Sequence, residues 1–110
     1  MRRSTDFATV VRSGVRARRG FLVVHHVPAL TPESTPLVGL VVGKPVGGSV
    51  VRHQVARRLR AQMAQRVHVL PQGSGTVVRA LPGAAESTSA QLGTDLDAAL
   101  ARVVGAGAIR

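Results

Sequence analysis

The side chains best suited to chemistry in this chain are cations, and a dense group of them lies in the segment from Lys44 to Arg66. Its cations are Lys44, Arg52, His53, Arg57, Arg58, Arg60 and Arg66. The chain has no Asp or Glu between Ser34 and Ala85. A merely solvated helix face interleaves acids with bases at i, i+4 spacing and does not require this exclusion. Because guanidinium groups hold phosphate through paired hydrogen bonds, the segment predicts an anion-binding surface, and its spacing favours a polyanion.

No side-chain arrangement typical of a self-sufficient hydrolase is present. The five acids are scattered, at Asp6, Glu33, Glu86, Asp95 and Asp97. They provide no carboxylate pair for two-metal catalysis, and no histidine has an acid nearby to orient it. His25 and His26 are adjacent, so on a strand they would point to opposite faces, and the chain has no cysteine. We therefore expect neither catalytic nor metal-binding residues.

Composition indicates one basic domain of 110 residues, spanning 1–110. Hydrophobic residues make up 45%, enough for a core, and the formal net charge of +10 is tolerated most easily when a partner neutralises it. Two Phe and no Tyr or Trp exclude a broad base-stacking platform. Without cysteine, and without the roughly 20 apolar residues of a membrane span, we expect a cytoplasmic protein with no membrane contact.

Periodicity and turn signals predict an α+β order of helix, strand, strand, helix, strand, helix. The expected helices cover 2–14, 49–67 with Ser49 as cap, and 88–104 with a Thr88–Gln91 capping box; the expected strands cover 21–27, 37–42 and 76–80. Residues 15–19 are expected to form a charged connector and 28–36 a proline-rich loop. The strand at 37–42 is expected to be central, a fourth strand to lie within 67–70, and residues 105–110 to form a frayed tail.

The two longer helices each show an apolar stripe. In the central helix the stripe is Val51, Val55, Leu59 and Met63, whereas His53, Arg57 and Arg60 lie on the far side and Arg58 on a flank. Arg52 falls in the apolar sector and is expected to reach past the core from the first turn. In the last helix the stripe is Leu92, Leu96, Leu100 and Val103, with Asp95 and Asp97 expected to face out.

The central segment resembles the protein subunit of bacterial ribonuclease P. That family carries the signature K-x-V-G-x-A-V-x-R-N-x-x-K-R-x-x-R, which appears here as Lys44-x-Val46-Gly47-x-Ser49-Val50-x-Arg52-His53-x-x-Ala56-Arg57-x-x-Arg60. Asp6-Phe7-x-x-Val10 with Gly14, and Arg79-Ala80-x-Pro82-Gly83, are similar to flanking family motifs. Ala56 departs from the family lysine and cannot bind phosphate, whereas His53, in place of asparagine, still can.

The resemblance implies a two-layer α+β sandwich, a fold shared with a ribosomal protein domain, in which a left-handed βαβ crossover connects parallel strands. It implies the protein subunit of the tRNA 5′-maturation endoribonuclease, in which the RNA subunit performs the cleavage with Mg²⁺ and the protein alone binds no cofactor. The partners implied are the ribonuclease P RNA and the precursor tRNA 5′ leader, with no obligate protein partner.

The resemblance also implies two sets of binding residues. The set for the RNA subunit is Lys44, Arg52, His53, Arg57, Arg58 and Arg60. The set for the leader is Phe7, Val11, Arg16, Arg18, Arg19, Val24 and His25, where the alignment leaves open by one residue whether Val24 or His25 lines the leader cleft. A core-anchoring role for Phe7 is the alternative to a ligand-facing one.

Three other functions compete with this interpretation. A small structural RNA-binding protein of ribosomal type has the same composition, and the spaced signature favours the ribonuclease P subunit over it. A DNA-binding helix-turn-helix is disfavoured because the basic helix follows a strand and a glycine turn. An independent hydrolase using His53 would act without RNA, which we do not expect.

Overall fold

The computed structural model describes residues 2–30 and 35–109, with side chains placed within 7–30 and 35–105. Residues 31–34, in the predicted proline-rich loop, lie outside the described residues. The helices are α1 (Arg2–Ser13), α2 (Ser49–Ala64) and α3 (Ser89–Ile109), and the strands are β1 (Val15–Arg19), β2 (Leu22–Val27), β3 (Leu37–Val41) and β4 (Gly75–Ala80). Short 3₁₀ helices occur at Lys44–Val46, Val67–Val69 and Ala84–Glu86.

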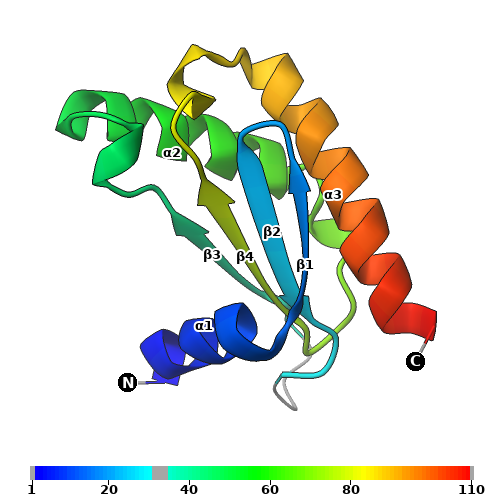
Figure 1. Ribbon diagram of the computed structural model, residues 1–110. Helices are drawn as coiled ribbons and strands as arrows, with labels where there is room; N and C mark the ends of the chain where they lie inside the picture. Colours follow the sequence, from blue (N-terminus) through cyan, green and yellow to red (C-terminus); the bar gives the residue numbers. More distant parts are fainter. Residues whose placement is uncertain (1, 31–34, 110) are drawn as a thin grey trace.

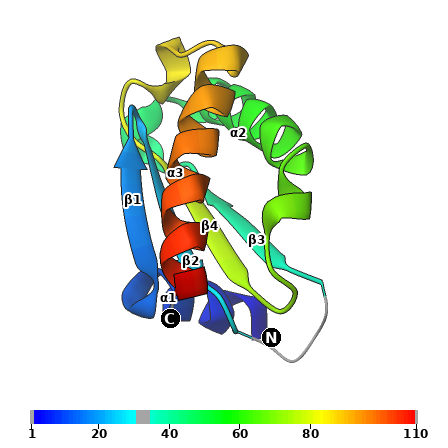
Figure 2. The ribbon, with the colours of Figure 1, turned by 90° about the vertical axis from the view of Figure 1, so that its right-hand side faces the viewer.

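The four strands form one mixed sheet in the order β1-β2-β4-β3. β2 pairs antiparallel with β1 and β4, whereas β3 and β4 are parallel and are connected through α2. In Figure 1, β3 and β4 point upwards and β4 lies to the right of β3. Figure 2 is turned so that the back of Figure 1 lies on its right, and it shows α2 on that side, so α2 lies behind the sheet of Figure 1. The crossover is therefore left-handed, as the family resemblance implies and against the usual preference.

The sheet corrects three expectations. The fourth strand is β1, where a charged connector was expected, while residues 67–69 form a 3₁₀ helix in place of a strand. β1 was missed because only Ala17 on it is buried, and an edge strand can expose several arginines without losing its pairing. β3 is an edge strand, not a central one; on its second face Gly39 lies under the Phe7 ring of α1, whereas Val41 is exposed.

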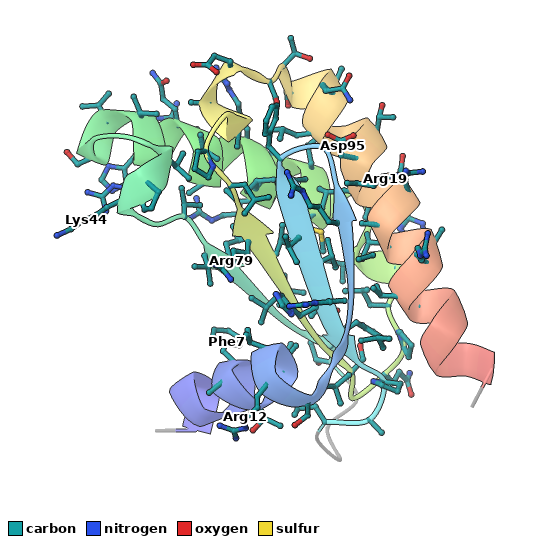
Figure 3. All side chains as sticks on the ribbon, in the orientation of Figure 1. Phe7, Arg12, Arg19, Lys44, Arg79 and Asp95 are labelled. Atoms are coloured by element: carbon teal, nitrogen blue, oxygen red, sulfur yellow. The ribbon has the colours of Figure 1, made fainter. Side chains whose placement is uncertain are left out.

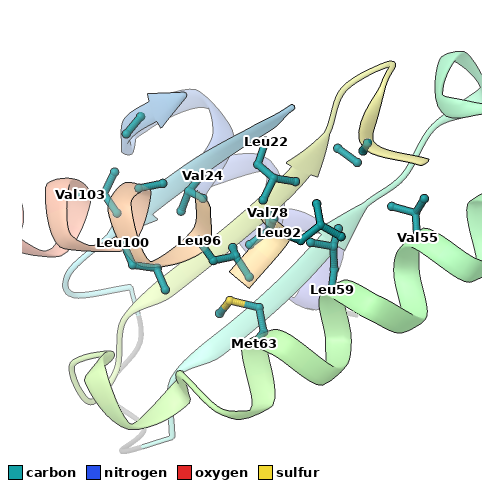
Figure 4. Close-up of a cluster of buried hydrophobic side chains, with 14 of the residues drawn as sticks. Leu22, Val24, Val55, Leu59, Met63, Val78, Leu92, Leu96, Leu100 and Val103 are labelled. Atoms are coloured by element: carbon teal, nitrogen blue, oxygen red, sulfur yellow. The ribbon is translucent and has the colours of Figure 1, made fainter. Parts of the chain in front are cut away.

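The core lies between the sheet and the layer formed by α2 and α3 (Figure 4). Both predicted helix stripes are confirmed, since Val55, Leu59 and Met63 of α2 are buried together with Leu92, Leu96, Leu100 and Val103 of α3. Leu22, Val24 and Val78 meet them from the sheet. Val51 is only partly buried and packs at the margin of this cluster.

The helix ends differ in part from the sequence pattern. Gly48 is the N-cap of α2 and no side chain caps this helix, so Ser49 is its first residue instead of its cap. Thr88 Oγ1 does accept the Gln91 N–H, at 3.0 Å, whereas the Gln91 side chain donates to Asp95 Oδ1 at 3.1 Å instead of closing the box. α3 continues to Ile109, so residues 105–109 are helical where a frayed tail was predicted, and residue 110 lies outside the described residues.

α1 lies across the lower end of the opposite face of the sheet and leaves the upper part of that face uncovered (Figures 1 and 3). Phe7 explains the close contact with β3, because a Cβ on Gly39 would lie 2.7 Å from Cζ of the Phe7 ring. Val10 is fully buried against Gly75 of β4, where a Cβ would lie 2.8 Å from Val10 Cγ2. The glycines on β3 and β4 thus let α1 approach the sheet closely.

Candidate nucleic-acid interface

The α2 surface, defined by Lys44, Arg52, His53, Arg57 and Arg60, is the first basic surface of the molecule. The Gly47–Gly48 turn sets the direction in which α2 leaves the preceding 3₁₀ helix and so orients this surface. Only glycine fits at position 47, because a Cβ there would lie 2.8 Å from Val51 Cγ1. His53, Arg57 and Arg60 are exposed on the far side of the helix from the core, and Lys44 is exposed beside the helix N-terminus. The free N–H groups of that terminus add positive potential.

Two arginines of α2 behave differently from their exposed neighbours. Arg58 lies on the flank, where Nη1 donates to the carbonyl oxygens of Ala85 at 3.5 Å and Ser87 at 3.2 Å. Its guanidinium therefore tethers the loop before α3, which the sequence pattern did not predict. Arg52 is half-buried, and its Nε is buried without a hydrogen-bond partner.

Two adjoining grooves follow the outer edge of β3. One, of about 300 Å³, is lined by Leu40, Val42, Ser49, Arg52, His53, Ala56 and Arg60. The other, of about 500 Å³, is lined by Phe7, Val38, Gly39, Leu40, Arg60, Met63, Ala64 and Val67. Leu40 and Arg60 belong to both, so the grooves connect the α2 surface with the aromatic ring on α1.

The open sheet face, defined by Arg16, Arg18, Val23, His25 and Arg79, is the second basic surface. The register places His25 between Arg16 and Val77, and Val23 between Arg18 and Arg79. His25 is only 2% exposed, and neither ring nitrogen has a hydrogen-bond partner. Burial lowers the pKa of His25, with smaller contributions from the positive charges of Arg16 and Arg79.

The open sheet face includes three residues of the predicted leader set, two others lie on α1, and the remaining two are excluded. Phe7, Arg16, Arg18 and His25 lie on the α1 side, with Phe7 both anchored on Gly39 and exposed to the groove, and Val11 is exposed on α1. Val24 is fully buried in the opposite core, so of the two alternatives only His25 lies on the α1 side of the sheet. Arg19 pairs with Leu22, whose side chain lies in that core, so it belongs to the α3 side (Figure 3).

Sequence reasoning overlooked Arg79 and Arg102 as site residues. Arg79 is the exposed residue within an otherwise buried β4, and Figure 3 shows it on the open face above Phe7. A single arginine inside an apolar strand was the available signal. No such signal marks Arg102 in the sequence, because its position beside β1 depends on how α3 crosses the sheet.

The described residues contain no group of three or more His, Asp or Glu side chains placed to share a metal ion. Asp95, expected to face out, is 9% exposed beside Gly20. Asp97 is exposed, and a hydrogen bond from Arg66 Nε, at 2.6 Å, lowers its pKa. No helix in the described part of the chain is long and apolar enough to cross a membrane.

The fold and the two surfaces define a class: a single-domain α+β protein that presents connected basic surfaces to a nucleic acid. Known proteins agree with this class and narrow it. The family model for ribonuclease P matches residues 1–104. The ribonuclease P protein component of Streptomyces avermitilis is 54% identical over 98% of this chain and 94% of its own length. That of a Mycobacterium species is 51% identical over 93% and 86%.

The chain therefore belongs to the ribonuclease P protein family. Solved structures agree on the fold. The RNase P protein of Staphylococcus aureus has a TM-score of 0.76 at 24% identity, covering 90% of this chain and 91% of the other. That of Thermotoga maritima has a TM-score of 0.74 at 20% identity, covering 89% and 91%.

Proposed function

We propose that this chain is the protein subunit of ribonuclease P and that it acts by positioning RNA. Family membership makes it an RNA-binding component of tRNA 5′ maturation, associated with the ribonuclease P RNA. The observation that carries the mechanism is the α2 surface, whose exposed cations occur in a stretch of sequence without any acid. On this proposal the RNA subunit, with its Mg²⁺ ions, performs the cleavage, and the protein supplies no catalytic residue.

The α2 surface is proposed to bind the RNA subunit. Fixed cations along one helix face neutralise neighbouring phosphates, and such contacts position an RNA without reading its sequence. Arg60 contributes to both grooves at β3, so it connects this contact to the substrate side of the molecule. Arg58 is removed from the predicted set of phosphate ligands, because its guanidinium already binds two backbone carbonyls.

The open sheet face is proposed to hold the single-stranded leader. Phe7 provides an apolar ring at the groove beside β3, and Arg79 on β4 with Arg16 and Arg18 on β1 provide phosphate partners across the sheet. His25 has two buried ring nitrogens without partners, an arrangement that costs stability unless a ligand or water satisfies them. A base or ribose of the leader would satisfy one of them, whereas phosphate contacts alone would leave leader sequence unread.

The deciding experiment is cleavage of a precursor tRNA at low Mg²⁺ by a bacterial ribonuclease P RNA alone, this protein alone, and both together. We expect release of the 5′ leader only from the mixture. Cleavage by the RNA alone that the protein does not improve, although the protein binds RNA, would contradict the proposal and favour a structural RNA-binding protein of ribosomal type.

A matched pair of variants tests the α2 assignment. Arg57→Ala with Arg60→Ala should weaken binding of the RNA subunit and flatten the salt dependence of binding by about 1 to 2 units in log–log slope, because two phosphate contacts disappear. Arg58→Ala is the control: it should lower the free energy of unfolding by about 1 kcal/mol and leave the slope unchanged. Equal slopes for the double variant and the wild type would remove the α2 surface from the proposal.

A further inference from the structure

The β1–α3 pocket is a third basic site, separate from the α2 surface. It is a hollow of about 250 Å³ at the outer edge of the sheet, lined by Arg16, Ala17, Arg18, Arg19, Ala98, Ala99 and Arg102. Its four arginines come from both faces of β1 and from one turn of α3. Among the described side chains the one ion pair is Arg66–Asp97, so no described carboxylate forms an ion pair with the guanidinium groups of the pocket.

The shape of the pocket suits the backbone of a nucleic acid. Its remaining lining residues are alanines, whose short side chains leave room for a phosphate between the arginines. β1 is an edge strand, so one row of its backbone N–H and C=O groups faces away from the sheet and adds donors at the rim. Asp95 packs against the turn at Gly20 and is not among the lining residues.

The pocket is continuous with the open sheet face. Arg16 and Arg18 line the pocket and also project from that face, opposite His25 and Val23. Because α1 crosses the lower end of the strands, the uncovered face above it runs across the sheet from β3 to β1 (Figure 1). Three strand spacings of about 4.8 Å make this distance about 14 Å. A single strand that crossed this face from Phe7 to β1 would leave the sheet at the rim of the pocket.

We propose that the β1–α3 pocket binds backbone phosphates of the leader, upstream of the nucleotides that lie on the open sheet face. This inference rests on the proposed function and extends its substrate site beyond the sheet. Arg19 and Arg102 are the residues that belong to the pocket and not to the open face. With no aromatic ring and no amide side chain in its lining, the pocket binds the leader without reading its sequence.

The test compares precursor tRNAs whose leaders lengthen one nucleotide at a time. The assembled holoenzyme, as wild type and as Arg19→Ala, Arg102→Ala and the double variant, is titrated under conditions where binding precedes cleavage. We expect each single variant to bind long-leader substrates about three-fold more weakly and the double variant about ten-fold. The salt slope of the double variant should fall by about 1.4 units, since each single-strand phosphate contributes about 0.7.

Three controls make the result decisive. With the shortest leaders all variants should bind as the wild type does, because those leaders end before the pocket. Arg12→Ala removes an equal charge from the side of α1 turned away from the open face (Figure 3) and should behave as wild type at every leader length. Unfolding curves and affinity for the RNA subunit report whether each variant is folded and assembled.

The alternatives have distinct signatures. A loss of affinity that is independent of leader length would overturn the inference and place the pocket against the RNA subunit or the tRNA body. Unchanged affinity at all lengths would overturn it as well. Failure of the wild-type protein to assist cleavage at all would instead overturn the proposed function, and this inference with it.

Discussion

The two faces of the sheet are built from the same strands, but one face packs into the core and the other presents cations. Along β2, Leu22, Val24 and His26 face α2 and α3, whereas Val23 and His25 face α1. The first face is sealed into the core, and the second is covered only at its lower end, with arginines along the uncovered part. Strand alternation thus places stability on one side and binding on the other.

The adjacent histidines show the difference most directly. His26, on the core side, is fully buried, and its Nδ1 is joined to Thr76 Oγ1 by a hydrogen bond of 2.9 Å. His25, on the other side, is nearly as buried but has no partner at either nitrogen and lies close to two arginines. His26 Nε2 is buried without a partner too, so the two rings differ in the one hydrogen bond that ties His26 to β4. A ring with no partner at either nitrogen, on a binding face, fits a ligand contact.

Leu96→Ala should break the core face and give the largest effect. Leu96 is fully buried among the sheet, α2 and α3, so its truncation leaves a cavity. We expect the free energy of unfolding to fall by about 3 kcal/mol. Urea unfolding measures this, and RNA affinity of the folded fraction should be unchanged. A loss under about 1 kcal/mol would show that this face does not carry the stability.

Gly39→Ala should disturb the contact between α1 and β3. The new Cβ would lie 2.7 Å from the Phe7 ring, so the ring or the helix must shift, at a cost of about 1 to 2 kcal/mol in unfolding free energy. Leader binding should weaken with it. The combination with Phe7→Ala serves as the control, because removing the ring should relieve the clash; fully additive effects would contradict this contact.

Acidification should destabilise the protein through both histidines. Burial lowers the pKa of His25 and of His26 below 6.5, so below that pH the unfolded state binds more protons than the folded state. The free energy of unfolding should be constant above 6.5 and fall below it, by up to about 1.4 kcal/mol per pH unit for each histidine. His25→Val should remove its part of the slope, and an identical pH profile in that variant would contradict the burial argument.

Arg79→Ala should give the smallest effect on stability and sharpen the contrast with Leu96→Ala. Arg79 is exposed on the open sheet face, so its loss should change the unfolding free energy by less than about 0.5 kcal/mol. Precursor tRNA should bind the holoenzyme about three-fold more weakly because one phosphate partner is gone. Fluorescence titration with a labelled substrate measures this, and Arg79→Lys should restore part of the affinity.

Local patterns were enough to identify the elements with strong periodicity. The apolar stripes of α2 and α3, the Thr88 cap and the far-side position of His53, Arg57 and Arg60 follow from spacing within single segments, where each residue's neighbours are fixed by 3.6-residue periodicity. The spaced signature also identified the family, because it combines glycine turn, helix start and cations in one stretch.

Tertiary structure decided the features that depend on partners distant in sequence. Residues 15–19 form a strand because β2 pairs with them, and β3 lies at the edge because β4 inserts between it and β2. Arg58 donates hydrogen bonds to carbonyl oxygens of a loop 27 and 29 residues further along the chain. The side to which Val24, His25 and Arg19 point was settled by which face α2 and α3 cover. A sequence gives the alternation along a strand, but only the packing of helices determines which alternate face becomes the core and which is left open to bind.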